Sequence, residues 1–168
     1  MKTALSIAAL CIVLLAACTT HAQQRSRRNP PKQNTSEAKS ETTPTVEYLT
    51  SDGTRNLPFS DAVRVGHMLY LSGQIGTDGA AGLVAGGIRA ETKQTMENIR
   101  RVLERNGSSF DRVVKCTVML ADMSEWGAMN EVYVTYFTKG RLPARSALGA
   151  NGLALGARVE IECWATVK

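Results

Sequence analysis

The chain lacks the residues and short motifs on which many enzyme sites depend. Only two of its 168 residues are histidines, His21 in an N-terminal polar segment and His67 in a predicted turn. No glycine-rich phosphate loop follows a predicted strand, no cysteine–histidine spacing fits zinc, and no Ser-His-Asp set stands out. These absences argue against nucleotide, zinc and serine-hydrolase chemistry. We expect no metal and no cofactor.

A basic surface on the folded part is also missing. The formal net charge is +5, but residues 1–44 hold six Lys or Arg against two Glu, and residues 45–168 hold fourteen against thirteen acidic residues. Aromatic residues make up 5% of the chain. Nucleic-acid binders usually show a basic stripe with interleaved aromatic side chains. We therefore expect no nucleic-acid partner.

The N-terminus has the pattern of an export signal. Lys2 precedes an apolar run over residues 4–17, which is too short for a transmembrane helix and typical of a signal peptide. Residues 15–18, Leu-Ala-Ala-Cys, have the form of a lipobox, in which cleavage leaves Cys18 to carry lipid. The alternative is a soluble secreted form cut after Ala22. Both predict an exported protein, and the lipobox predicts a periplasmic lipoprotein held to the membrane through Cys18.

The remaining sequence predicts a linker and one domain. Residues 18–44 are mostly polar, with few side chains to bury, so we expect a flexible linker between a signal peptide at 1–17 and a domain at 45–168. Alternating and helical periodicities in the domain predict a first strand, a hairpin, a helix, a strand, a second helix capped by Ser124 and a final hairpin. Their ranges are 46–50, 62–73, 89–105, 112–120, 125–138 and 143–168. This order predicts an α+β fold, with both helices on one face of a sheet.

Two cysteines lie within the predicted strands. Cys116 and Cys163 each fall on the apolar side of an alternating run. We expect buried free thiols, although an oxidising compartment would permit a disulfide.

The final hairpin places two charged residues opposite each other. If the chain reverses between Gly152 and Leu153, Arg145 and Glu160 become cross-strand neighbours on one face. One interpretation is a solvated ion pair. The other is a site in which Arg145 binds a substrate carboxylate and Glu160 handles a proton.

Four segments, in order, carry a resemblance to a known family. They are Leu71–Gly76, Gln94–Ile99, Met129–Tyr133 followed by Phe137, and Pro143–Ser146 with Glu160 fifteen residues after Arg145. Together they resemble the RidA/YjgF family, also called the endoribonuclease L-PSP family, from about Pro58 to Val167. The resemblance implies a chorismate-mutase-like fold, with one mixed sheet carrying two helices on one face, assembled as a homotrimer with sites between subunits.

The resemblance also implies a reaction. Members hydrolyse reactive enamines and imines of 2-amino acids, such as 2-aminoacrylate, to 2-keto acids and ammonia. Arg145, Glu160 and Ser72 match the catalytic positions, and five further residues match the substrate-binding positions: Phe59, Gly73, Asn130, Tyr133 and Ala147. Two of these depart from the family pattern, because Phe59 replaces a tyrosine and Ala147 replaces a cysteine.

Other functions remain open from the sequence. A non-catalytic module that binds carboxylates, or that acts as a chaperone, would keep Arg145 without needing the missing hydroxyl of residue 59. An endoribonuclease fits the second family name but not the charge distribution. The sequence does not identify the physiological imine, and it does not decide whether Phe59 abolishes deamination.

Overall fold

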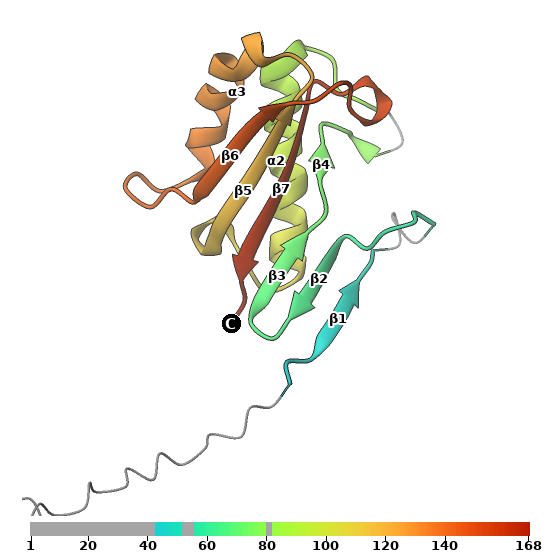
Figure 1. The fold of residues 1–168 in the computed structure, drawn as a ribbon, viewed down its shortest axis with the longest axis vertical. Helices are drawn as coiled ribbons and strands as arrows, with labels where there is room; N and C mark the ends of the chain where they lie inside the picture. The colour runs from blue at the N-terminus through green and yellow to red at the C-terminus, as the bar shows by residue number, and fades with distance from the viewer. Residues whose placement is uncertain (1–42, 52–55, 80–81) are drawn as a thin grey trace, which may run out of the picture. The chain divides into compact units, whose positions relative to one another are not determined.

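The computed structural model describes residues 43–51, 56–79 and 82–168, which form one mixed sheet with helices against one face (Figure 1). The strand order is β1-β2-β3-β7-β5-β6, and the short β4 also pairs with β7. All pairings are antiparallel except that of β5 with β6, which is parallel. The strands are β1 (Val46–Leu49), β2 (Ala62–Val65), β3 (Met68–Leu71), β4 (Gln74–Ile75), β5 (Val113–Leu120), β6 (Ala144–Gly149) and β7 (Val159–Thr166).

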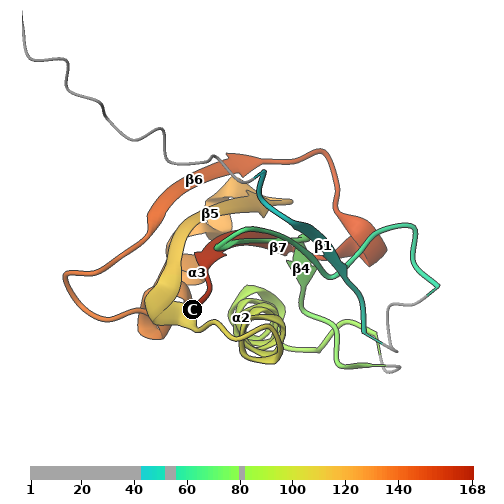
Figure 2. The same cartoon turned by 90° about the horizontal axis from the view of Figure 1, so that it is seen from below.

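The core lies between the sheet and two helices, α2 (Gly87–Arg105) and α3 (Trp126–Tyr133). Figure 2 shows both helices on the same side of the sheet, as the sequence predicts. The apolar face of α2 packs on alternate residues of β5 and β7, and the largest fully buried side chains include Leu69, Met96, Ile99, Leu103, Leu120, Met129 and Ile161. The opposite face of the sheet carries no helix (Figure 2).

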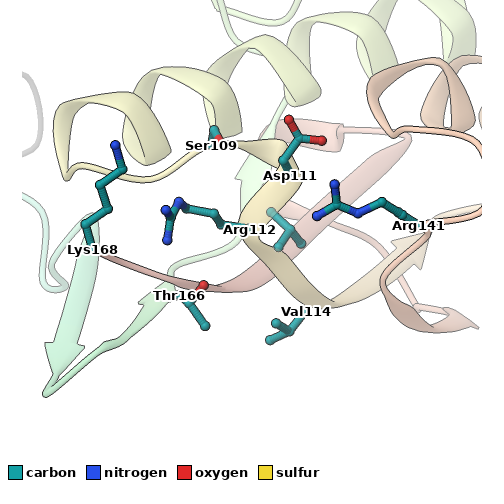
Figure 3. Close-up of a pocket in the computed structure, with 8 residues that line it drawn as sticks. Ser109, Asp111, Arg112, Val114, Arg141, Thr166 and Lys168 are labelled. Carbon is teal, nitrogen blue, oxygen red and sulfur yellow. The ribbon is translucent and has the colours of Figure 1, made fainter.

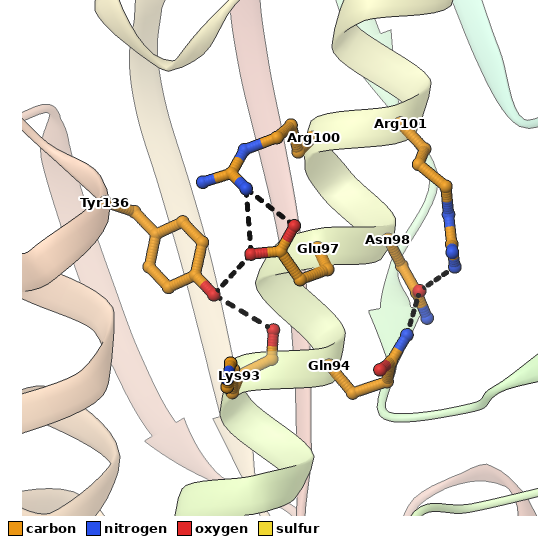
Figure 4. Close-up of polar contacts among 7 residues, drawn as sticks. All are labelled: Lys93, Gln94, Glu97, Asn98, Arg100, Arg101 and Tyr136. Atoms are coloured by element: carbon orange, nitrogen blue, oxygen red, sulfur yellow. Dashed lines mark hydrogen bonds and ion pairs between the residues drawn. The ribbon is translucent and has the colours of Figure 1, made fainter.

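Polar contacts attach α2 to the turn after α3, as Figure 4 shows, and also to β4. On one side, the Tyr136 hydroxyl, just after α3, lies 2.8 Å from the Glu97 carboxylate and 3.2 Å from the Lys93 carbonyl oxygen. Burial, followed by the hydrogen bond to Glu97 and the charge of Glu97, raises the pKa of Tyr136 to about 12, so the phenol stays protonated and donates. On the other side, the Asn98 amide donates to the carbonyl oxygens of Ile75 and Thr77 at 2.8 and 3.0 Å. One helix therefore positions both α3 and β4.

The second helix is shorter than its periodicity predicts. A 3-10 turn over Met123–Glu125 precedes α3, and another over Val134–Tyr136 follows it. The Asp122 carboxylate, not Ser124, caps the first turn by accepting a hydrogen bond from the Ser124 backbone N–H at 2.8 Å. Helical spacing places Trp126 on the same face as the buried Met129 and Tyr133, but Trp126 is 40% exposed.

A β-bulge interrupts β5 near its start. The register with β7 shifts between Val113 and Lys115, which turns Val113 into the core and leaves Val114 exposed. Simple alternation predicts the reverse, because it places Val114 on the same face as Cys116. The extra residue of a bulge changes the phase of the strand, and periodicity cannot locate it.

The expectation of free thiols is wrong. Cys116 on β5 and Cys163 on β7 are directly opposed, with Cα atoms 4.2 Å apart, and form a disulfide in the core. Both side chains are fully buried. The pairing depends on the register of two strands 47 residues apart in sequence, which neither strand's pattern specifies.

The expectation of a final hairpin is also wrong. β6 and β7 do not pair, because β5 lies between them, parallel to β6 and antiparallel to β7. The intervening residues 150–158 form a longer connection that includes a 3-10 turn, in which Leu155 has φ 58°. Arg145 and Glu160 are therefore not cross-strand partners.

The predictions for residues 1–42 lie outside the described residues. They include the signal peptide, the lipobox at Cys18 and nearly all of the linker. Among the helices that the structure does describe, none combines the length and apolar character needed to cross a lipid bilayer.

Candidate functional site

Arg145 lies on β6 and faces the helices. Its neighbour on β5 is the buried Cys116, so the two side chains point to the same face of the sheet. The guanidinium donates a hydrogen bond from Nη1 to Asn130 Oδ1 at 2.7 Å, and its Cζ lies 4.7 Å from the Tyr133 ring centroid and 5.6 Å from that of Trp126. Such cation–π contacts hold a guanidinium in place without neutralising its charge.

No carboxylate among the described residues forms an ion pair with Arg145. The side chain is half-buried, and most of its N–H groups remain available to a ligand. A planar guanidinium in this state is suited to bind a carboxylate through two parallel hydrogen bonds. We call Trp126, Asn130, Tyr133, Arg145 and Ala147 the Arg145 cluster.

Tyr133 supplies the buried side of this cluster. The residue is 3% exposed, and its hydroxyl has no hydrogen-bond partner in the described part of the chain. Burial raises the pKa of Tyr133 to about 12, although the positive charge of Arg145 opposes the shift. The phenol therefore stays neutral and is able to donate a hydrogen bond. Ala147, two residues after Arg145 on the same face, packs against the core.

Glu160 lies on the opposite face of the sheet. Its neighbours along β7, Val159 and Ile161, point into the core, which leaves Glu160 on the face without helices. Within the described ranges its carboxylate has no hydrogen bond or ion pair, although the residue is only half-exposed. Burial raises the pKa of Glu160, and repulsion from Glu162 adds to the shift. An unpaired carboxylate with a raised pKa is a suitable general base.

Gly73 makes room for this carboxylate. A Cβ atom at position 73 would lie 1.9 Å from Glu160 Oε1 and 2.8 Å from its Cδ. Any other residue at position 73 would displace the Glu160 side chain. The absence of a side chain, rather than a special backbone angle, is what the site needs here.

Ser72 fixes the segment that approaches Gly73. Its hydroxyl donates to the Ser60 carbonyl oxygen at 2.7 Å, and its backbone N–H donates to the Asp61 carbonyl oxygen at 3.0 Å. This contact holds the end of β3 against the segment that begins with Phe59, whose side chain is 51% exposed. We call Phe59, Ser72, Gly73 and Glu160 the Glu160 cluster.

The two clusters do not meet within one chain. Arg145 faces the helix layer from β6, at the edge of the sheet, whereas Glu160 faces the other way from β7, with β5 between them. The eight candidate residues named from the sequence therefore fall into two groups. Among the described residues, no three His, Cys, Asp or Glu side chains gather closely enough to hold a metal ion.

Trp126 belongs to the Arg145 cluster but was not a candidate in the sequence. Helical spacing placed it with the buried residues Met129 and Tyr133 of the same helix, and periodicity alone cannot distinguish a core position from a rim position. Trp126 lies four residues before the candidate Asn130, and residues four apart share one face of a helix, so this spacing could have identified Trp126.

The chain resembles proteins of one family over most of the described domain. The sequence model of the family described as Endoribonuclease L-PSP matches residues 54–167. A mouse protein named 2-iminobutanoate/2-iminopropanoate deaminase is 49% identical over 106 residues, which cover 62% of this chain and 78% of the mouse protein. The human protein of the same name is 45% identical over 106 residues, with coverages of 62% and 77%.

Solved structures agree with the sequence matches. The yeast protein YEO7 superposes with a TM-score of 0.69 at 35% identity, covering 74% of this chain and all of that one. RidA from the Antarctic bacterium Psychrobacter sp. PAMC 21119 gives a TM-score of 0.63 at 33% identity, covering 75% and 99%. The predicted fold, one mixed sheet with two helices on one face, is therefore confirmed by both the sheet topology and these neighbours.

Proposed function

The chain belongs to the Endoribonuclease L-PSP family, also called RidA/YjgF, and we propose that it is an imine deaminase that hydrolyses 2-imino acids to 2-keto acids and ammonia. One observation carries the proposal. Within the described part of the chain, Arg145 has no carboxylate partner and is held by Asn130 and aromatic rings, and Glu160 has no cationic partner and occupies the space left by Gly73. These are the two groups that hydrolysis of a 2-imino acid requires.

Each cluster takes one part of the reaction. Arg145 binds the substrate carboxylate through two parallel hydrogen bonds, with Asn130 and the two aromatic rings fixing the plane of the guanidinium. Glu160 accepts a proton from water as the water oxygen attacks the carbon of the C=N bond. That proton passes to the nitrogen, which gives a carbinolamine with a hydroxyl and an amino group on the same carbon. Glu160 then takes the proton of the hydroxyl and returns it to the amino nitrogen as the C–N bond breaks and the C=O bond forms, so that ammonia and the 2-keto acid leave.

A complete site needs two copies of the chain, with the Arg145 cluster of one facing the Glu160 cluster of another. Three features support assembly, which we propose to be the homotrimer implied by the family. β6 is an edge strand with unpaired backbone groups. The helix-free face of the sheet carries large exposed apolar residues, Leu148 at 45% and Trp164 at 41% exposure. The third feature is that the Arg145 cluster contains no carboxylate to act as a base, and the Glu160 cluster contains no cation to bind a carboxylate.

Mixing two inactive variants tests this arrangement. Arg145→Ala and Glu160→Gln should each lack activity as pure proteins. After unfolding and refolding together in equal amounts, about one quarter of the sites in a ring of subunits combine an intact Arg145 with an intact Glu160. Ammonia release should therefore return to about a quarter of the wild-type rate. A mixture that stays inactive while light scattering shows mixed trimers would contradict a site shared between subunits.

The same assay separates the alternatives. A protein that binds 2-keto acids and releases no ammonia from freshly generated 2-imino acids would be a carboxylate-binding module. Cleavage of RNA that survives Glu160→Gln and Arg145→Ala would point to a ribonuclease with a different site.

We also propose that the protein is exported and lipid-anchored. The sequence of residues 15–18 supports the lipid anchor, and the Cys116–Cys163 disulfide supports an oxidising compartment, because such bonds are rare in the cytosol. Cys18→Ser should release the protein from the membrane fraction. A wild-type protein that is wholly soluble and begins at Gln23 would contradict the anchor. The protein can also be unfolded without reductant and treated with a thiol reagent. Full reaction of Cys116 and Cys163 would contradict the oxidising compartment.

A further inference from the structure

A polar hollow lies away from both clusters, at the end of the sheet where β5 begins and β7 ends. It encloses about 590 Å³ and is lined by Ser109, Asp111, Arg112, Val113, Val114, Arg141, Thr166 and Lys168. None of these residues belongs to the Arg145 or the Glu160 cluster. Deamination as proposed above makes no use of them.

Three basic side chains converge on this hollow. In Figure 3 they extend across it, with Arg112 drawn between Lys168 and Arg141. Among the described residues none of the three forms an ion pair, and no hydrogen bond engages their charged groups. Arg112 is half-buried in this unpaired state. The lining thus holds three basic side chains, none of them in an ion pair that the structure records among the described residues.

One carboxylate lies among them. Asp111 lines the same hollow, but its Oδ1 accepts a hydrogen bond from the Thr138 hydroxyl at 3.1 Å. Because three basic side chains outnumber this one carboxylate, the net side-chain charge of the lining is positive. The basic side chains repel one another, and a bound anion would reduce this repulsion.

The bulge in β5 shapes the hollow. The register shift between Val113 and Lys115 turns Val114 outward into the lining and places Arg112, the residue before the strand, beside it. Bulges often re-aim side chains at functional positions. Here the bulge leaves an apolar wall beneath the three basic groups.

We propose that this hollow binds the phosphate or pyrophosphate group of a small molecule. A carboxylate offers two oxygens and one charge, which would leave at least one of the three cations unpaired. A phosphate group carries close to two negative charges and three oxygens at neutral pH, and pyrophosphate carries more of both. The hydroxyls of Ser109 and Thr166 are further donors in the lining, and the Val113–Val114 wall suits an apolar part of the ligand.

Inorganic pyrophosphate is the probe for the first test. Calorimetric titration of the purified protein should show saturable binding that weakens as salt is added, because exposed charges are screened. Arg112→Gln and Arg141→Ala should each weaken binding about tenfold. Lys139→Ala removes the same charge two residues from Arg141, outside the hollow, and should leave binding unchanged. Acetate should bind much more weakly than pyrophosphate.

The outcomes separate this site from the proposed active site. Both arginine variants should keep wild-type ammonia release, since neither belongs to the two clusters. Arg141 is exposed, so its variant keeps the test valid even if Arg112→Gln unfolds the protein. Absence of saturable binding to both probes, pyrophosphate and the vesicles below, or equal weakening in Lys139→Ala, would overturn the proposal.

A lipid headgroup offers the same phosphate chemistry as a free ligand. Vesicles of phosphatidylglycerol in phosphatidylcholine, tested with Cys18→Ser to remove the anchor, distinguish the two sources. Vesicle binding that Arg112→Gln and Arg141→Ala weaken, without binding of pyrophosphate, assigns the phosphate to a headgroup. Pyrophosphate binding without vesicle binding assigns it to a soluble molecule.

Discussion

The Arg145 and Glu160 clusters differ in the contacts that they give to their charged side chains. Arg145 is surrounded by partners that hold it without neutralising it: an amide oxygen and two aromatic rings. Glu160 has no hydrogen-bond or ion-pair partner among the described residues, and its carboxylate occupies space that a side chain at position 73 would fill. The second arrangement raises the pKa of Glu160 through burial and repulsion from Glu162, which makes the carboxylate a better base. In the proposed reaction, the Arg145 cluster binds the substrate and the Glu160 cluster transfers the proton.

Loss of the arginine should have the largest effect. Arg145→Ala removes two charge-assisted hydrogen bonds to the substrate carboxylate, so we expect kcat/KM to fall about a thousandfold and 2-keto acid affinity about a hundredfold. Arg145→Lys should restore little, because an ammonium lacks the planar fork. Steady-state kinetics and calorimetry measure both. Arg141→Ala removes the same charge four residues away and is the control. Unchanged keto-acid affinity in Arg145→Ala would show that Arg145 does not bind the carboxylate.

Loss of the base should separate turnover from binding. Glu160→Gln keeps the shape of the side chain and removes its basicity, so kcat should fall about a hundredfold or more, with keto-acid affinity within a few-fold of wild type. A solvated charge without a catalytic role predicts something else: stability changes of at most about 1 kcal/mol and full activity. Equal loss of affinity in the arginine and glutamate variants would erase the distinction between the two clusters.

The pH dependence tests the raised pKa of Glu160. A base works when deprotonated, so kcat/KM should rise with pH through a midpoint above the ordinary glutamate pKa of 4.5. Glu162 contributes to the shift through its negative charge. Glu162→Gln should therefore move the midpoint to lower pH while keeping the rise, and Glu160→Gln should abolish the rise. A profile that Glu160→Gln leaves unchanged would assign the titration to another group.

The space at Gly73 offers a smaller perturbation of the same cluster. Gly73→Ala places a Cβ 1.9 Å from Glu160 Oε1, so the flexible carboxylate must rotate away while the backbone stays. We expect kcat to fall about tenfold with little change in melting temperature. Gly127→Ala is the matched control, since its Cβ meets no atom within 4 Å and lies in α3 beside Trp126. If both variants behave alike, the position of the Glu160 carboxylate does not depend on Gly73.

The sequence predicts the individual helices and strands better than it predicts which strands lie side by side in the sheet. The β2–β3 hairpin and the helix ending at Arg105 follow their periodicities, because both depend on contacts close in sequence. The pairing of β6 and β7 was wrong because the glycines between them favour a local reversal, while burial favours the insertion of β5. Strand order is a long-range choice that alternation does not encode.

The candidate site shows the same limit. The resemblance names eight candidate residues, and the structure places them in two clusters, but this geometry, with Arg145 and Glu160 on different faces of the sheet, could not be read from their spacing. The disulfide and the exposed position of Trp126 depend on register and on the edge of the sheet. These are properties of the assembled sheet, not of any one segment.

The smallest effect should come from restoring a hydroxyl. Phe59 replaces the tyrosine of the family pattern, and its side chain is 51% exposed, so Phe59→Tyr adds a hydroxyl without burying it and should leave the fold intact. The Ser72 hydroxyl, bonded to the adjacent Ser60 carbonyl oxygen, keeps this segment beside Gly73. If the new hydroxyl orients water or substrate at Glu160, kcat should rise a few-fold, because one added transition-state hydrogen bond contributes about 1 kcal/mol. The gain should disappear in the double variant with Glu160→Gln. A gain that persists there would mean that the hydroxyl acts outside the Glu160 cluster, and no gain at all would mean that this chain positions its water without it.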